Sequence, residues 1–241
     1  MNLTVNIRAP IGGNKNAQEF SDPLVQIGNG VYTGGNTQEL GTDTVSLIQD
    51  LVSSVYGNVT EIVTYNNSWL CERVILTPRK DQAAAINAEI LSFVSGDNVE
   101  YISINRVMEE EESTNYPEEF LESLSDPGQP AHIINLKVGV PIMLLRNLSP
   151  SQLCNGTRLK VTNLQRNVIE AEIITGCGAG DRVFLTPITL ISNDFSFNFK
   201  RVQFPVNICY AMTINKSQGQ TLQVAGVDLS TVLHCMYNVI I

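Results

Sequence analysis

The sequence is poor in the residues that build metal sites, disulfide frameworks and membrane spans. Its 241 residues include five cysteines and two histidines, and the cysteines form no Cys-x-x-Cys pair. A zinc site needs about four ligands placed close together, and a disulfide framework needs dense, evenly numbered cysteines in a short chain. No apolar run reaches the roughly 18 residues that a membrane-spanning helix requires. We therefore predict no metal site and no membrane partner, and interpret the cysteines as free, mostly buried thiols.

Several catalytic signatures are also absent. No Gly-x-Ser-x-Gly or His-Glu-x-x-His motif occurs, and His132 and His234 lie far apart in the sequence, which argues against a serine or zinc hydrolase. The sequence contains neither a Gly-x-x-x-x-Gly-Lys-Ser/Thr phosphate-binding loop nor an Asp-Glu pair. The first residues lack the apolar core of a signal peptide, so we predict an intracellular protein.

Charge is distributed unevenly along the chain. The net charge is −9, which argues against nucleic acid as a partner for the chain as a whole. Residues 1–136 hold 6 Lys+Arg and 19 Asp+Glu, whereas residues 137–241 hold 9 Lys+Arg and 5 Asp+Glu. Much of the acidity lies in one segment, Glu109–Glu112 followed by Glu118, Glu119 and Glu122, which is typical of a solvated acidic loop and helix face. Any binding to phosphates is therefore expected in the C-terminal half.

The apolar pattern of the first half indicates alternating helices and strands. A β-branched run that ends before Pro78 predicts a strand, and Asp81 is a plausible N-cap for the helix that follows it. Such alternation favours an α/β fold with a parallel sheet. The pattern predicts helices over residues 17–27, 45–55 and 81–93, and strands over 73–77 and 99–104.

The character of the sequence changes near Pro130. Short apolar runs separated by Gly, Asn and Asp predict closely spaced strands, which are typical of a small barrel or sandwich. We interpret residues 131–192 as a small β-barrel inserted into the α/β domain, with residues 1–130 as its first part and 193–241 as its return. The predicted strands of the insert cover residues 133–136, 142–145, 157–164, 168–174 and 183–185.

One segment carries most of the chemical information. A buried strand ends at Thr213 and is followed by the polar turn Asn215-Lys216-Ser217-Gln218-Gly219. Hydroxyl groups, a lysine and free backbone N–H groups at such a junction suit phosphate oxygens. The segment 211–222 resembles motif V of superfamily 1 helicases, most closely that of the petite-integration-frequency (PIF) type, including the versions carried by Helitron transposons. Further segments match this family in the expected order: 5–8, 20–30, 74–79, 85–87, 136–148, 153–159 and 203–206.

The resemblance implies a fold and an activity. The expected fold is a RecA-like α/β domain that carries an inserted small β-barrel, and the expected activity is ATP-dependent 5′-to-3′ DNA unwinding. Single-stranded DNA is the expected partner, and ATP with Mg²⁺ is the expected cofactor of the intact enzyme. A preceding RecA-like domain, which is missing from this sequence, would hold the phosphates. A nuclear location is predicted, with the mitochondrion as the alternative.

The resemblance also assigns roles to single residues. It gives Thr213, Asn215, Lys216 and Ser217 to the DNA, and Gln218 and Gly219 to the nucleotide cleft. It gives Thr77 and Arg79 to the DNA backbone and Arg8 to the γ-phosphate of ATP, since a guanidinium can bridge phosphate oxygens. The alternatives are a surface turn with a capping serine at 213–219, an ordinary strand end at Thr77, and surface arginines at positions 8 and 79.

Two further sets of residues have two interpretations each. The barrel cations Arg146, Arg158, Lys160 and Arg166 could line the DNA path or be simply solvated. The phenylalanines 195, 197, 199 and 204 could stack on bases, but packing in the core is the better interpretation.

The end of the chain leaves two rival functions open. After Ser230 the sequence departs from the family, and the arginine of motif VI is not found. We therefore predict that this chain alone does not hydrolyse ATP. A catalytically dead, single-stranded DNA-binding remnant of a transposon-type helicase is the alternative function, and a poorly folded pseudogene product is a further one.

Overall fold

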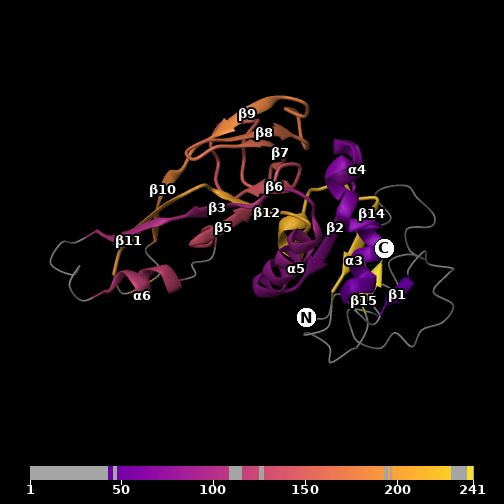
Figure 1. The fold of residues 1–241 in the computed structure, drawn as a ribbon, viewed down its shortest axis with the longest axis horizontal. Coiled ribbons are helices and arrows are strands. Elements are labelled where there is room, and N and C mark those ends of the chain that lie inside the picture. Colours follow the sequence, from indigo (N-terminus) through magenta and orange to yellow (C-terminus); the bar gives the residue numbers. More distant parts are fainter. Residues whose placement is uncertain are drawn as a thin grey trace, which may run out of the picture.

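The chain folds into an α/β structure in which one mixed sheet is joined to a group of antiparallel sheets (Figure 1). The computed structural model describes residues 43–45, 48–108, 116–124, 128–192, 195, 197–228 and 238–240. The predicted helix over 17–27 and the predicted phosphate contact Arg8 lie outside the described residues.

The mixed sheet has a parallel centre and an antiparallel edge. Its strand order is β1-β15-β14-β2-β13, and β2 pairs in parallel with both β13 and β14. β15 runs antiparallel to β14 and to β1. The predicted α/β class is therefore confirmed, although the sheet is not parallel throughout. The strands are β1 (Asp43–Val45), β2 (Arg73–Thr77), β13 (Ala211–Thr213), β14 (Val224–Val227) and β15 (Asn238–Ile240).

Short helices pack against this sheet. α3 (Ile48–Tyr56) buries Leu51 and Val55, and a Cβ added at Gly226 of β14 would lie 2.9 and 2.8 Å from these two side chains. Glycine at this position therefore allows the helix to approach the strand closely. The 3₁₀ helix η2 (Val59–Thr64) and α4 (Asn67–Cys71) follow α3, and α5 (Lys80–Phe93) follows β2.

The two helices predicted over residues 45–55 and 81–93 lie within the described residues and are present as α3 and α5, but their ends differ from the prediction. Val45 belongs to strand β1 rather than to the helix. The N-cap of α5 is Arg79 instead of Asp81, because Asp81 lies within the first helical turn and pairs with Arg79. Phe93 is 51% exposed, and Leu91 and Val94 are buried at this end of the helix instead.

Four strands of the strand-rich insert, together with β12 from beyond it, form an antiparallel sheet with the order β12-β6-β7-β8-β9, which we call the meander sheet. All five strands that were predicted over 133–185 are confirmed within one or two residues at each end. Closure of the sheet into a barrel and the boundaries at 130 and 192 stay predictions. The strands are β6 (Pro141–Leu144), β7 (Arg158–Leu164), β8 (Ile169–Ile173), β9 (Arg182–Leu185) and β12 (Val206–Ile208).

The single strand predicted over 99–104 is wrong. The chain divides at Ser103 into β3 (Val99–Ile102), which pairs with β5 (Ile133–Leu136), and β4 (Ile104–Val107), which pairs with β11 (Phe199–Gln203). Both pairings are antiparallel and lie outside the mixed sheet. β10 (Ile188–Ser192) completes the three-stranded sheet β10-β11-β4.

The short helix α6 (Glu118–Ser123) packs against the three-stranded sheet. The buried Arg201 donates hydrogen bonds to the carbonyl oxygens of Leu121 and Leu124 at 3.0 and 3.1 Å, and to Oδ1 of Asn105 at 2.8 Å. The predicted core role of the phenylalanines is confirmed, because Phe197 and Phe199 are buried in one cluster with Phe195 packed against it, and Phe204 is buried in the main core.

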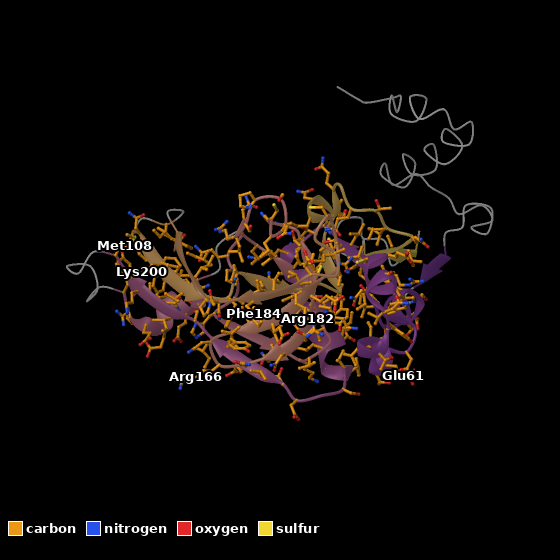
Figure 2. All side chains as sticks on the ribbon, turned by 90° about the horizontal axis from the view of Figure 1, so that it is seen from above. Glu61, Met108, Arg166, Arg182, Phe184 and Lys200 are labelled. Carbon is orange, nitrogen blue, oxygen red and sulfur yellow. The ribbon has the colours of Figure 1, made fainter. Side chains whose placement is uncertain are left out.

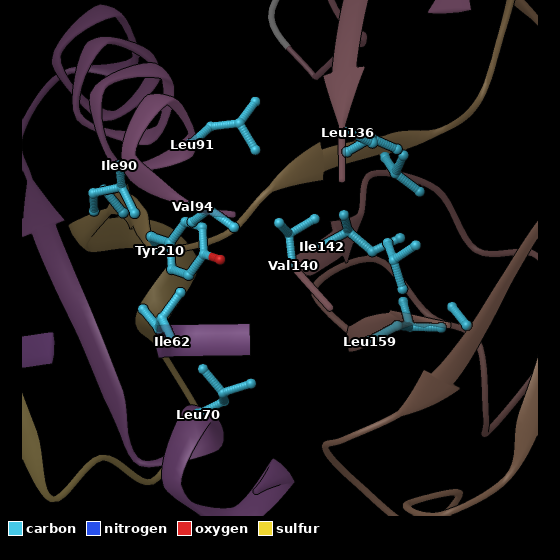
Figure 3. Packing of buried hydrophobic residues seen from close by; sticks show 14 of the residues in the cluster. Ile62, Leu70, Ile90, Leu91, Val94, Leu136, Val140, Ile142, Leu159 and Tyr210 are labelled. Carbon is cyan, nitrogen blue, oxygen red and sulfur yellow. The ribbon is translucent and has the colours of Figure 1, made fainter. Parts of the chain in front are cut away.

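One hydrophobic core connects the mixed sheet with the meander sheet. Figure 3 shows Tyr210 with Ile62 and Ile90 on one side and Val140 and Ile142 on the other, and all five belong to the same cluster. The chain passes from β12 in the meander sheet to β13 in the mixed sheet through Tyr210. The two sheets therefore share buried apolar surface, which stabilises them as one body.

Polar contacts reinforce this junction. Arg158 is 1% exposed and donates to the carbonyl oxygens of Leu70, Cys71 and Arg73 at 2.9, 3.0 and 3.2 Å. Both predicted roles for Arg158 are therefore wrong, since it neither lines a DNA path nor lies in solvent. Lys160 likewise donates to the carbonyl oxygen of Tyr65 at 2.9 Å, and burial lowers the pKa of its ammonium group.

The sequence predicted mostly buried cysteines and no membrane-spanning helix. Of the described cysteines only Cys209 is buried, Cys71 and Cys154 are half-buried, and Cys177 is exposed, so the expectation of mostly buried thiols is wrong. Within the described ranges, no helix has both the length and the apolar character needed to cross a membrane.

Candidate nucleic-acid interface

Two of the segments predicted to contact DNA lie side by side at one edge of the mixed sheet. β13 and β2 pair in parallel with Thr213 directly opposite Thr77, and these are the last residues of their strands. The turn after β13 and the Pro78-Arg79 turn after β2 therefore leave the sheet together. The carboxyl ends of strands in α/β sheets are where ligands usually bind.

The turn after β13 is a short 3₁₀ helix. η4 (Ile214–Ser217) has Thr213 at its N-cap, and the Thr213 side chain makes no capping hydrogen bond. Ser217 Oγ donates to the carbonyl oxygen of Ile214 at 2.7 Å, so this hydroxyl supports the turn itself. Asn215 is exposed and Thr213 is half-buried.

The predicted nucleotide-cleft residues continue this turn. Gln218 and Gly219 are exposed, and the backbone N–H of Gln220 donates to the carbonyl oxygen of Ser217 at 2.9 Å. Gly219 has a φ of +84°, with open space where a Cβ would lie. Glycine is therefore required here for its backbone conformation rather than for a close contact.

Thr77 and Arg79 have different environments. Thr77 is fully buried and its Oγ1 donates to the carbonyl oxygen of Arg79 at 2.8 Å, so the hydroxyl stabilises the turn. Arg79 is exposed and makes two hydrogen bonds with Asp81, at 3.0 and 2.7 Å. The hydrogen bond from Arg79 lowers the pKa of Asp81, and the same pair raises the pKa of Arg79. An exposed ion pair of this kind is weak, so the guanidinium can exchange Asp81 for another anion.

Lys216 contacts the meander sheet. Its Nζ donates to Oδ1 of Asn155 at 2.8 Å, and Asn155 lies in the loop between β6 and β7. Gln220, which follows four residues later, donates to the carbonyl oxygen of Gly156 at 3.5 Å. The loop 154–157 is therefore part of the candidate site. No role was predicted for these loop residues, and only their family-like Asn-Gly-Thr pattern could have indicated one.

A carboxylate also lies at this edge. Asp228 directly follows β14, its backbone N–H donates to the carbonyl oxygen of Leu76 at 2.8 Å, and its side chain is nearly buried. Gln82 of α5 donates to Asp228 Oδ2 at 3.3 Å. Sequence reasoning missed this residue because a single Asp after a short apolar run has no local signature.

Comparison with known proteins shows similarity to Pif1-type helicases. A family model described as the 2B domain of the DNA helicase Pif1 matches residues 119–164, from α6 to the end of β7. The ATP-dependent DNA helicase Pif1 of Bdellovibrio bacteriovorus is 30% identical over 198 residues, which is 77% of this chain and 42% of that protein. The chain is thus similar in sequence to a Pif1-type helicase over most of its length. The human ATP-dependent DNA helicase PIF1 is also 30% identical, over 106 residues that cover 42% of this chain and 16% of the human protein.

Solved Pif1 structures share the fold. A structure of two coordinating Pif1 helicases, described as a basis for unwinding forked DNA, has 25% identity and a TM-score of 0.51, and covers 86% of this chain and 40% of that one. The Bacteroides Pif1 helicase in complex with ADP-AlF3 and ssDNA has 23% identity and a TM-score of 0.52 over 89% of this chain and 43% of that chain. The RecA-like α/β fold is therefore that of Pif1-type helicases. The chain spans less than half the length of these relatives.

Proposed function

We propose that this chain is the C-terminal motor portion of an ATP-dependent 5′-to-3′ DNA helicase, and that it engages single-stranded DNA at the edge formed by β2 and β13. The register of Thr213 with Thr77 carries this proposal, because it brings two segments with phosphate-binding character together at the carboxyl ends of parallel strands. Lys216 and Arg79 supply positive charge, and Thr213, Asn215 and Ser217 supply neutral polar groups. Such a set suits a phosphodiester backbone without selecting a sequence.

The buried hydroxyl of Thr77 contributes indirectly in this proposal. Its hydrogen bond to the Arg79 carbonyl fixes the turn, and the turn presents the Arg79 guanidinium to solvent. A phosphate would then replace Asp81 as the partner of Arg79. Arginine suits this exchange because its fork can bind two oxygens of one phosphate.

The nucleotide part of the proposal concerns the intact helicase. ATP with Mg²⁺ would supply the free energy of phosphoanhydride hydrolysis between this domain and a second RecA-like domain. From this chain, Gln218 and Gly219 on the exposed turn after η4, together with Arg8, would approach the nucleotide. We assign no Mg²⁺ ligand to the described ranges, in which no group of three or more His, Cys, Asp or Glu could hold a metal ion.

A salt-dependent binding measurement tests the DNA part. Fluorescence anisotropy of a labelled single-stranded oligonucleotide should show affinity that falls as salt rises, since cations of the protein displace counterions from DNA. Lys216→Ala should weaken binding and reduce the salt slope by about 1. Lys200→Ala is the matched control, because β11 lies far from β2 in Figure 1 and Lys200 lies beside Met108 at one end of the molecule in Figure 2. A folded chain that shows no salt-dependent binding would contradict the proposal.

ATP hydrolysis by the full-length gene product distinguishes the proposed helicase motor from the alternative of a catalytically dead remnant. Turnover of ATP that is stimulated by single-stranded DNA is expected for the motor. Binding to DNA without stimulated turnover would favour the catalytically dead remnant. We further propose a Helitron-like branch and a nuclear location, and a tagged full-length product found outside both the nucleus and the mitochondrion would contradict the latter.

A further inference from the structure

The predicted DNA-binding lysine is held by a residue from a different sheet. Lys216 Nζ donates to Asn155 Oδ1 at 2.8 Å, although the two residues are 61 positions apart. Gln220, one turn after Lys216, donates both to the carbonyl oxygen of Gly156 and to that of Lys216 itself, each at 3.5 Å. The 3₁₀ turn η4 and the loop 154–157 of the meander sheet therefore form one hydrogen-bonded unit.

The loop that presents Asn155 is itself well braced. The backbone N–H of Asn155 donates to Asn147 Oδ1 at 2.7 Å, and that of Gly156 donates to the carbonyl oxygen of Leu144 at 2.9 Å. Thr157 Oγ1 accepts from the backbone N–H of Cys154 at 3.1 Å. Gly156 has a φ of +93°, which lets the chain turn at this point. The Asn155 side chain is thus offered to Lys216 from a fixed backbone.

The chemistry of the contact leaves the charge of Lys216 intact. An amide oxygen is a neutral acceptor, so the ammonium group is oriented without being neutralised. The exposed cation Arg79 differs, because its partner Asp81 is a carboxylate. A free lysine side chain loses considerable rotamer freedom when it binds a phosphate. A lysine that is already oriented loses less of it, and preorganisation of this kind increases affinity.

We propose that Asn155 is a positioning residue for Lys216, so that the phosphate site of the motor domain is completed by a loop of the meander sheet. This inference rests on the proposed binding of single-stranded DNA. Asn155 orients the ammonium group through its Oδ1 atom, and Lys216 makes the contact with the phosphate. Through this loop, the position of the meander sheet affects the orientation of Lys216 and therefore the affinity for single-stranded DNA.

A double-mutant cycle on the 241-residue chain tests the inference, with a labelled single-stranded oligonucleotide as the probe. Asn155→Ala should weaken binding about 3- to 10-fold, the range expected for one side chain that is no longer preorganised. In the Lys216→Ala background the same substitution should change binding less than about twofold, because the residue to be positioned is gone. Asn163→Ala, an exposed asparagine of β7, is the matched control and should bind like the wild type.

A charge variant separates positioning from simple loop damage. Asn155→Asp keeps an acceptor at the same place and should still hold Lys216, but its carboxylate neutralises the ammonium group and repels phosphate. We expect binding weaker than that of Asn155→Ala, together with a smaller salt slope. An aspartate variant that binds like the wild type would overturn the inference. The thermal midpoints of all variants should match that of the wild type, since the backbone N–H of residue 155 keeps its bond to Asn147.

The outcomes distinguish this inference from the proposed function. If Lys216→Ala weakens binding and Asn155→Ala does not, the positioning role is wrong while DNA binding by the turn stands. If the two substitutions weaken binding additively, Asn155 contacts DNA independently and the inference is also wrong. If the folded wild-type chain does not bind the oligonucleotide at any salt concentration, the proposed function itself fails.

Discussion

At the scale of single residues, two buried tyrosines with different hydrogen bonding meet at the junction of the sheets. Tyr56 is fully buried and its hydroxyl donates to the carbonyl oxygen of Tyr210. The Tyr210 hydroxyl is buried and has no hydrogen-bond partner among the described residues. A buried polar group without a partner costs about 1–3 kcal/mol, whereas a made hydrogen bond contributes about 1 kcal/mol net. The two hydroxyls should therefore affect stability in opposite directions.

Substitution by phenylalanine tests this difference. Tyr56→Phe should lower the free energy of unfolding by about 1 kcal/mol, since it removes a buried hydrogen bond to the Tyr210 carbonyl, which keeps only its bond from the backbone N–H of Ile75 at 3.0 Å. Tyr210→Phe should leave it unchanged or raise it by up to about 2 kcal/mol. Urea unfolding at neutral pH measures both, and each variant is the control for the other because both remove one hydroxyl from the same core. Equal losses in the two variants would contradict the argument.

The buried hydroxyls of these two tyrosines should also make the folded chain less stable at high pH. Burial raises the pKa of both Tyr56 and Tyr210 above the usual value of 10.0. Above pH 10.0 the unfolded chain loses these protons and the folded chain keeps them, so the contribution of the two tyrosines to stability is full below that pH and falls as the pH rises further. Tyr210→Phe should make this fall shallower in urea titrations on both sides of that pH. Burial also raises the pKa of the Cys209 thiol, so part of the fall should persist in the variant.

At the scale of elements, a side chain of α5 replaces missing sheet hydrogen bonds. Asn87 is buried, its Oδ1 accepts from the backbone N–H groups of Tyr210 and Ala211 at 2.9 and 2.8 Å, and its Nδ2 donates to the Ala211 carbonyl at 2.8 Å. These backbone groups lie where the chain leaves β12 and enters β13. The amide therefore fixes the start of the strand that leads to the candidate site.

Removal of this amide should be costly. Asn87→Ala leaves several buried backbone groups unpaired, so the free energy of unfolding should fall by about 2–4 kcal/mol. Asn87→Asp can still accept the N–H bonds but turns a carboxylate toward the Ala211 carbonyl in the core, and it should also destabilise. Ser92→Ala, at an exposed position of the same helix, is the control and should change stability by less than about 0.5 kcal/mol. Chemical denaturation of the three variants measures these values, and an Asn87→Ala midpoint equal to that of Ser92→Ala would refute the role.

The elements that the sequence predicted are those with a strong local pattern. The β-branched run of β2, the apolar stripe of α5 and the short runs of the meander sheet are periodic within a few residues, and the structure confirms them. The division of 99–107 into two strands depends on pairing with 133–136 and 199–203, which no local pattern encodes. The burial of Arg158 and the contact of Lys216 with Asn155 likewise join residues that are 51 or more positions apart. Local periodicity therefore predicted the elements and the family resemblance indicated motif V, whereas the contacts that complete the site required the fold.

At the scale of the whole molecule, Arg158 links the two sheets. Besides three carbonyl groups around α4 and β2, its guanidinium reaches the carbonyl oxygen of Cys209 at 3.4 Å, between β12 and β13. All these acceptors lie outside β7, the strand that carries Arg158. Because a shared apolar core also joins the sheets, we expect the wild-type chain to unfold in one cooperative transition.

Loss of this arginine should weaken the connection without removing either sheet. Arg158→Ala leaves a cavity and buried carbonyl groups without donors, and it should destabilise the chain by about 3–5 kcal/mol, a large part of the roughly 5–15 kcal/mol that holds a typical domain together. Arg158→Lys keeps the charge but offers its donors from one point, so it should restore only part of this stability. Arg166→Ala, at an exposed position after β7, is the control and should be within about 0.5 kcal/mol of the wild type. Thermal and urea unfolding followed by circular dichroism measure the order of the four proteins. A midpoint for Arg158→Ala equal to that of Arg166→Ala would mean that the apolar core alone joins the sheets. A loss of stability specific to Arg158 would mean that this guanidinium is a polar link between the sheets. It would then also help to keep the meander sheet, and with it Asn155, in place beside Lys216.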